Sequence, residues 1–360
     1  MKCSRLLSRL FAMPLALAFT CLLAIPSVAE EKSKFSVCWS IYVGWMPWDY
    51  GAQSGIVKKW ADKYGLEIDV VQINDYIESI NQYTAGKYDG CTMTNMDALT
   101  IPAAGGVDST ALIVGDFSNG NDGLVLKGKT ALADVKGQSV NLVELSVSHY
   151  LLARALESVG LSEKDVKVVN TSDADMVSAY ATDDVNAVVT WNPLLSEIVA
   201  MPSSTKVFDS SNIPGEIIDL MVVNTETLKA NPKFGKALVG AWYEIMALMS
   251  ADNEQGKAAR LAMGKASGTD LAGYDAQLAS TRMFYKAAEA VDFVASKDLK
   301  ETMGYVASFS YKHALLGEGA ADAGFVGIET PAGILGDRAN VKLRFPTEYM
   351  SMAAEIIKII

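Results

Sequence analysis

The chain has 360 residues, half of them apolar and a fifth charged, which is enough for two or three packed domains and excludes a disordered chain. Its formal net charge of −11 argues against a nucleic-acid-binding protein, which would show a basic surface. With two histidines and four cysteines, a zinc cluster of His and Cys ligands is nearly excluded by counting.

The first 29 residues predict a secretory signal peptide. Three basic residues precede an apolar run from Leu10 to about Ile25, and Ser27 and Ala29 supply small residues at positions −3 and −1. We therefore expect cleavage after Ala29 and a periplasmic protein. The alternative, an uncleaved membrane anchor, is disfavoured because the run is short for a span. The segment has no acidic residue, so its removal takes the net charge from −11 to −14.

The mature chain begins with alternating strands and helices. Strands are expected at 34–41, 66–72, 89–94 and 111–114, and helices at 47–64, 74–85 and 97–104. Two cysteines, Cys38 and Cys91, lie in the apolar strand-like segments. An oxidising compartment permits a disulfide between them, but buried free thiols fit the sequence equally well.

The same alternation restarts downstream. Strands are expected at 124–127, 139–143, 166–169, 187–191 and 217–223, with helices at 148–159 and 174–181. After residue 231 the pattern is almost wholly helical, with helices at 231–249, 254–263, 274–293 and 298–313 and a less regular tail after Gly317. Strands that alternate with helices predict an α/β fold of doubly wound, mostly parallel sheets.

Two sequence features that could indicate catalysis are better explained by structural roles. Residues 123–130 match the phosphate-binding pattern G-x-x-x-x-G-K-[ST], but the residues between the glycines read as a strand and no long helix follows. His149 and His313 stand at the start and the end of predicted helices without a motif partner, so surface or capping roles are favoured over a catalytic triad.

Ligands of doubly wound sheets bind beyond the carboxyl ends of the strands, so the segments after the strands matter most. Residues 35–57, 70–86 and 90–121 contain carboxylates and indoles but no lysine or arginine. Aromatic faces with carboxylates suit a cation. Core packing of the indoles, helix capping by the aspartates, and anion binding at helix N-termini are the competing interpretations.

We expect a small cation or a polar neutral ligand rather than an anion. The predicted site has aromatic walls formed by Trp45, Trp48 and Trp191 and carboxylates from Asp49, Asp75, Asp97 and Glu144. Asn95, Ser146 and Asn192 are expected to supply neutral hydrogen bonds, and Asp219 is an acid on the second strand that crosses between the lobes.

Several short motifs, in this order, resemble the periplasmic substrate-binding proteins of ABC importers of the nitrate, sulfonate and taurine type. They are Trp45-Met-Pro47, Tyr88-Asp89-Gly90, the segment 132–140, the segment 149–166 and the segment 185–193, within a likeness that covers most of residues 35–315. Within this group the chain looks closest to the branch associated with urea carboxylase. That resemblance implies a urea- or guanidine-like ligand.

The resemblance also implies a two-lobed, type II-like binding protein with a helical C-terminal region. Residues 30–117 and 222–360 would form one lobe, residues 123–218 the other, and the hinge would lie near 117–123 and 218–222. The expected partners are a small-molecule ligand and an inner-membrane ABC permease; we expect a monomer without cofactor or metal.

The alternatives are a binding protein for a taurine-, sulfonate- or nitrate-type anion, a sensory module, and an exported enzyme. Thiamine-pyrimidine synthesis enzymes resemble this group but carry a cysteine-rich segment, which the two distant cysteines of the mature chain do not provide. We therefore do not expect an enzyme.

Overall fold

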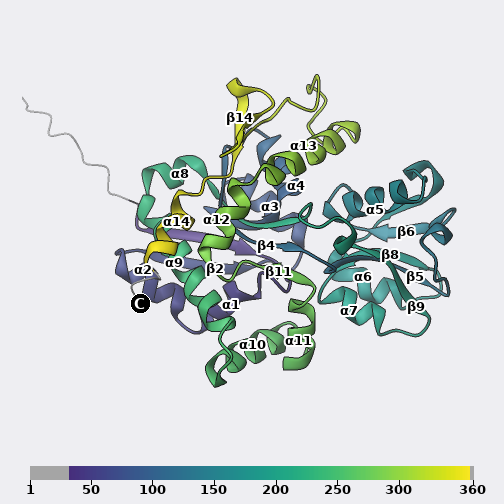
Figure 1. Cartoon of the computed structure of the whole chain (residues 1–360), viewed down its shortest axis with the longest axis horizontal. Helices are drawn as coiled ribbons and strands as arrows, with labels where there is room; N and C mark the ends of the chain where they lie inside the picture. Colours follow the sequence, from purple (N-terminus) through teal and green to yellow (C-terminus); the bar gives the residue numbers. More distant parts are fainter. Residues whose placement is uncertain (1–31, 357–360) are drawn as a thin grey trace, which may run out of the picture. The chain divides into compact units, whose positions relative to one another are not determined.

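The computed structural model describes residues 32–356, without the side chain of Ile356, and contains two β-sheets with many helices (Figure 1). The α/β fold class predicted from the sequence is confirmed. The predicted signal peptide lies outside the described residues. In the described part, no helix combines the length and apolarity that crossing a membrane requires.

The first sheet has nine strands in the order β13-β12-β14-β4-β10-β3-β1-β2, with β11 paired to β4. Its strands are β1 (Lys34–Trp39), β2 (Glu67–Gln72), β3 (Gly90–Thr94), β4 (Ser109–Ser118), β10 (Ile218–Asn224), β11 (Thr281–Met283), β12 (Gly327–Thr330), β13 (Gly333–Leu335) and β14 (Val341–Arg344). Strands β2, β1 and β3 are parallel, whereas β10 runs antiparallel to both β3 and β4. The apolar sequences of β4 and β10 suit central strands that are covered on both faces.

The second sheet has five strands in the order β7-β6-β8-β5-β9. Its strands are β5 (Asp122–Lys127), β6 (Ser139–Leu142), β7 (Lys167–Asn170), β8 (Ala187–Trp191) and β9 (Ser204–Asp209). Strands β7, β6 and β8 are parallel, and β5 is antiparallel to β8 and β9. The helices α5 (Val147–Ser158), α6 (Asp173–Tyr180) and α7 (Leu194–Val199) pack against this sheet (Figure 1).

The helices around the first sheet come from both ends of the chain. They are α1 (Met46–Gln53), α2 (Ile56–Lys63), α3 (Tyr76–Thr84), α4 (Asn95–Ala98), α8 (Thr225–Ala230), α9 (Pro232–Met249), α10 (Glu254–Ala266), α11 (Leu271–Leu278), α12 (Ala287–Ala295), α13 (Lys297–Lys312) and α14 (Glu348–Ile356). Helix α9 packs against α1, α2 and α14, and a stack of Trp48 on Trp242, with ring centroids 5.2 Å apart, joins α1 to α9.

Three predictions of secondary structure are wrong. The helix expected at 47–64 is broken at Gly55, whose φ of 78° ends α1 and starts α2. The helix expected at 274–293 is interrupted by β11, and the irregular tail contains β12, β13, β14 and α14. These short strands complete a sheet whose centre forms from distant residues, so local periodicity does not reveal them.

Two segments connect the sheets: residues 119–121 between β4 and β5, and residues 210–217 between β9 and β10. The residues between the glycines of the phosphate-loop match, 124–127, belong to β5, so the prediction that they form a strand is confirmed.

Cys38 and Cys91 form a disulfide, a question that the sequence left open. They stand opposite each other on the parallel strands β1 and β3, with their Cα atoms 4.5 Å apart, and both are fully buried. The disulfide links two neighbouring strands of the first sheet and leaves no free thiol among residues 32–356.

Candidate functional site

A small cavity lies between elements of the two sheets. Its lining residues come from the segment that follows β1, from the last residues of β3 and β8, from β5 and β10, and from the first turns of α3 and α5. They are Tyr42, Trp45, Tyr76, Thr94, Asp122, Val147, Trp191 and Asp219. The cavity leaves about 10 Å³ for the centre of a water-sized molecule, close to the minimum that holds one water.

Four aromatic rings follow one another around this cavity. The ring centroids are 5.0 Å apart between Tyr42 and Trp45, 5.7 Å between Trp45 and Tyr76, and 5.5 Å between Tyr76 and Trp191. All four side chains are buried, and Nε1 of Trp191 donates a hydrogen bond of 3.2 Å to the carbonyl of Ile41. The second sheet therefore supplies one aromatic wall and the first sheet supplies three.

Two of the nearby carboxyl groups face each other across neighbouring strands. Asp116 on β4 and Asp219 on β10 are register partners, and the hydroxyl of Tyr42 donates to Asp116 Oδ1 at 2.9 Å. Burial raises the pKa of Asp116 to about 7, although the proximity of the Asp219 carboxyl and the hydrogen bond from Tyr42 oppose the shift. Burial and then the charge of Asp116 raise the pKa of Asp219 well above its usual value. A proton shared by the pair is therefore favoured.

Two further carboxyl groups surround the same cavity. Asp97 accepts hydrogen bonds from the hydroxyls of Tyr76 (2.6 Å) and Thr94 (2.9 Å), and burial raises its pKa to about 6 against these hydrogen bonds. Asp122 accepts a bond of 2.5 Å from Ser118, and burial raises its pKa to about 7. The atoms Asp97 Oδ1, Asp116 Oδ2 and Asp219 Oδ2 are buried without a hydrogen-bond partner in the described part of the chain.

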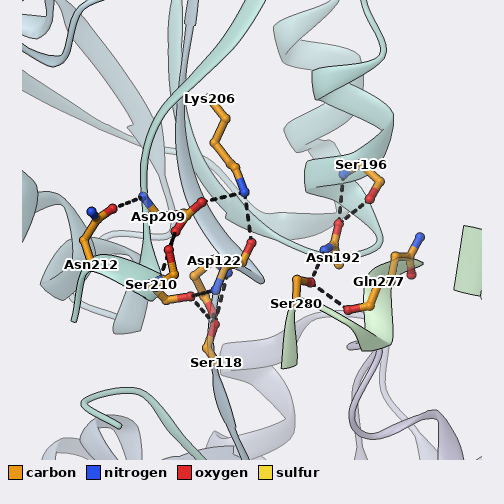
Figure 2. A network of polar contacts seen from close by, with 12 residues as sticks. Ser118, Asp122, Asn192, Ser196, Lys206, Asp209, Ser210, Asn212, Gln277 and Ser280 are labelled. Atoms are coloured by element: carbon orange, nitrogen blue, oxygen red, sulfur yellow. Dashed lines mark hydrogen bonds and ion pairs between the residues drawn. The ribbon is translucent and has the colours of Figure 1, made fainter. Parts of the chain in front are cut away.

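Among the described residues, none of these four carboxyl groups has a basic partner. No ion pair between residues within 32–356 includes Asp97, Asp116, Asp122 or Asp219. Lys206, beside the connection between the sheets, forms an ion pair of 2.6 Å with Asp209 (Figure 2). It also donates a hydrogen bond of 3.2 Å to the carbonyl of Gly120. The carboxylate of Asp122, drawn in the same view, accepts a hydrogen bond from Ser118 and forms no ion pair with a described residue, so the lysine does not neutralise it.

Direct hydrogen bonds close the two sheets around this region. The amide of Val43 donates to the carbonyl of Asn192 at 3.3 Å, and the hydroxyl of Ser172 donates to Asp75 at 3.1 Å. Asn192 also donates to Ser280 at 3.2 Å (Figure 2). Access to the cavity therefore requires some of these contacts to open.

Of the residues predicted for the site, Trp45, Trp191 and Asp219 line the cavity, and Asp97 lies directly behind two lining residues. The structure does not bring the other predicted residues to the cavity, because each has another place in the fold. These are Trp48, Asp49, Asp75, Asn95, Glu144, Ser146 and Asn192.

The reasons differ among these residues. Trp48 is a core residue stacked on Trp242, and Asn95 hydrogen-bonds the backbone of Glu216 and Ile218. Asp75 and Ser146 cap the N-termini of α3 and α5, the competing interpretation that the sequence already offered for Asp75. Asn192 bonds Ser280 and Ser196, while Glu144 is exposed and Asp49 is partly exposed in the first turn of α1.

Sequence reasoning missed six residues at or beside the cavity: Tyr42, Tyr76, Thr94, Asp116, Asp122 and Val147. For Asp116 a signal exists. It interrupts the apolar run Ala-Leu-Ile-Val-Gly-Asp-Phe, residues 111–117, in the same way that Asp219 interrupts its own strand, and an acid in a buried strand needs a special reason.

Two sheets joined by two connections, with a small cavity between their elements, make up the fold of the periplasmic binding proteins. Among solved structures, the alkanesulfonate-binding protein SsuA from Xanthomonas axonopodis pv. citri bound to MOPS matches with a TM-score of 0.64 and 17% identity over 81% of this chain and 96% of its own. The nitrate-binding protein NrtA from Synechocystis PCC 6803 matches with a TM-score of 0.66 and 13% identity, over 92% of this chain and 90% of its own.

The chain belongs to the NMT1/THI5-like family, whose model matches residues 54–255. A Brucella abortus (strain 2308) protein that is named as a binding protein is 25% identical over 201 residues, which are 54% of this chain. The match spans 61% of the length of that curated relative.

Proposed function

We propose that this protein is the periplasmic solute-binding component of an ABC importer and that it captures a small guanidinium-type cation for nitrogen uptake. One lobe would comprise residues 30–117 and 222–360 and the other residues 123–218. Bending near 117–123 and 218–222 would close the lobes on the ligand, and the closed form would deliver it to a membrane permease. The observation that carries the proposal is the group of buried carboxyls without a basic partner around an aromatic cavity. No catalytic step is proposed.

Charge is the first argument for a cation. Ionised carboxylates that are buried without a counter-ion are unfavourable, so Asp116, Asp122 and Asp219 remain partly protonated in the free protein. A bound cation would supply the missing positive charge and lower their pKa values. An anion would instead meet two acids, and neither lysine nor arginine, among the eight lining residues, with Asp97 and Asp116 beside them.

Shape and hydrogen bonding narrow the class of cation. Guanidinium is planar and donates hydrogen bonds from every nitrogen, and it accepts none. The unpartnered oxygens of Asp97, Asp116 and Asp219 are acceptors, and the faces of Trp45 and Trp191 suit a flat cation. Because the cavity has room for about one water, even a ligand of a few heavy atoms requires the contacts between the two sheets to open before it binds.

Two other ligands each have one observation in their favour. Nε1 of Trp45 is a buried donor without a partner in the described residues, which the carbonyl of urea could satisfy. An anionic ligand is favoured by the names of the solved neighbours, which bind an alkanesulfonate and nitrate. The absence of basic side chains among the eight lining residues weighs against the anion.

Calorimetry on the mature, tag-free chain tests the proposal. Guanidinium chloride, methylguanidine, urea, taurine and nitrate are titrated near pH 6.5 in two buffers that differ in ionisation enthalpy. We expect guanidinium to bind with release of protons to the buffer, because the cation lowers the pKa of the cavity carboxyls. An anion would drive proton uptake, and tight binding of taurine or nitrate without a guanidinium response would overturn the proposal.

Two aspartates near the connection between the sheets provide a matched control. Asp122 faces the cavity and its carboxylate accepts a hydrogen bond from Ser118, whereas Asp209 is paired with Lys206 (Figure 2). Asp122→Asn should weaken guanidinium binding by at least tenfold, and Asp209→Asn should leave it within about twofold. Equal effects of the two substitutions would count against a role for the cavity carboxyls.

A further inference from the structure

The only two histidines of the chain, His149 and His313, meet at one glutamate away from the acidic cavity. Nε2 of His149 bonds to Oε1 of Glu163, and Nε2 of His313 lies 3.0 Å from Oε2 of the same carboxylate. The capping role favoured from the sequence fits His313, which is the C-cap of α13. The sequence showed no partner motif for either histidine, because Glu163 meets both of them only in the fold.

This cluster joins the two halves of the molecule. His149 lies in α5 and Glu163 in the short helix Glu163–Asp165, both next to the second sheet, whereas His313 caps the C-terminus of α13, which packs on elements of the first sheet. The side chains are held in place by neighbours. The ring of His313 lies on Phe309, with centroids 4.2 Å apart, and Nδ1 of His149 accepts a bond of 3.1 Å from the amide of Leu145.

We propose that His149, Glu163 and His313 form a site for a divalent transition metal of the Zn²⁺ class, which would clamp α13 to α5. The donor atoms all lie within 4.8 Å of one another, and two imidazoles with one carboxylate are a ligand set that zinc takes while leaving a fourth position for water. Glu163 keeps 31% of its side-chain surface exposed, which provides an entry path for the ion. The small number of histidines and cysteines therefore does not exclude a metal site, because Glu163 supplies the third ligand.

Metal binding requires a change in the tautomer of His149. In the structure Nδ1 accepts a hydrogen bond, so the neutral ring carries its proton on Nε2. A metal at Nε2 requires that proton to move to Nδ1, so the amide of Leu145 must turn away. Leu145 is 44% exposed and has a φ of 63°, which is unfavourable for leucine, so its release costs little. Metal would thus reshape the loop beside Val147, which lines the acidic cavity.

Binding and tautomer can be measured together on the tag-free mature chain. Isothermal titration with Zn²⁺ should show one ion per chain, and Mg²⁺ should not bind, since imidazole suits zinc and not magnesium. The chain holds only two imidazoles, so ¹H–¹⁵N spectra report on this site alone. Addition of Zn²⁺ should convert His149 from the Nε2–H to the Nδ1–H form, and Co²⁺ should give the intense visible absorption of a four-coordinate site.

His313→Gln is the preferred variant because His313 is partly exposed at a helix end, whereas His149→Ala risks unfolding. The His313→Gln and Glu163→Gln substitutions should each weaken Zn²⁺ binding about 100-fold or more. The matched control is Glu157→Gln on the exposed surface of α5, which should leave Zn²⁺ binding unchanged. Absence of zinc binding by the wild type at 100 µM, or equal binding by wild type and His313→Gln, would overturn the proposal.

Discussion

The two ends of β4 hold aspartates in opposite situations. Asp108 directly precedes the strand and bonds to Arg344 through both of its oxygens, at 2.9 and 2.8 Å. Asp116, near the other end, faces Asp219 and Tyr42 and has no basic partner among the described residues. Burial would raise the pKa of Asp108, but the hydrogen bonds from Arg344 and Thr225 lower it overall, whereas burial raises the pKa of Asp116 to about 7.

The difference separates an acid that the protein pairs internally from one that it leaves without a counter-ion among the described residues. Asp108 is satisfied by the protein itself, so its ionised form contributes to stability. The ionised form of Asp116 is destabilising until something outside the chain supplies a positive charge. Buried carboxyls that cost stability in the free protein are typical of sites kept for a ligand.

The largest expected effect is on ligand affinity. Asp219→Asn keeps the size of the side chain and removes its charge, so guanidinium binding should weaken by about 1,000-fold, as for other buried charge-assisted contacts. Asp108→Asn should leave the affinity within twofold and should lower the free energy of unfolding by about 1 kcal/mol, because that ion pair is partly exposed. Calorimetry measures the affinity and urea denaturation measures the free energy of unfolding. A larger loss of affinity in Asp108→Asn than in Asp219→Asn would contradict the prediction.

The next effect concerns the free energy of unfolding, whose pH dependence should have opposite signs for Asp116 and Asp108 at the two ends of β4. The folded-state pKa of Asp116 is raised from 3.8 to about 7, so its stabilising contribution is present below pH 3.8 and is lost as the pH rises to 7. The pKa of Asp108 is lowered, so its contribution is present above pH 3.8 and is lost as the pH falls through its folded value. Urea denaturation between pH 3 and pH 8 should show both slopes.

Two controls isolate this prediction. Asp116→Asn should remove on the order of 3 kcal/mol of the decline in ligand-free stability between pH 4 and pH 8, which separates the cavity from general surface repulsion. Millimolar guanidinium should restore the stability of the wild type at pH 8 and leave that of Asp116→Asn nearly unchanged. A decline that is the same in both proteins would show that the cavity carboxyls do not cause it.

The sequence predicted the parts of this molecule that depend on local pattern. The strand–helix alternation up to β8 and the scarcity of basic residues near the cavity could be read directly. The chain alone could not show that Asp116 and Asp219 are register partners, because that pairing depends on β10 returning antiparallel to β4 from more than 100 residues away. For the same reason, the sequence could not show that His149 and His313 both lie beside Glu163. Capping by Asp75 and Ser146 was indistinguishable from ligand binding, since both uses place a polar side chain at a helix start.

The smallest expected effect distinguishes two tryptophans that the sequence treated alike. Trp191 lines the cavity and Trp48 stacks on Trp242 in the core. Trp191→Phe should weaken guanidinium binding by about tenfold, because the smaller ring attracts a cation less, with little change in stability. Trp48→Phe should leave the affinity unchanged and lower the free energy of unfolding by about 1–2 kcal/mol through the cavity it creates. If the two substitutions shift affinity equally, the aromatic wall is a packing feature, and the carboxyls alone select the ligand.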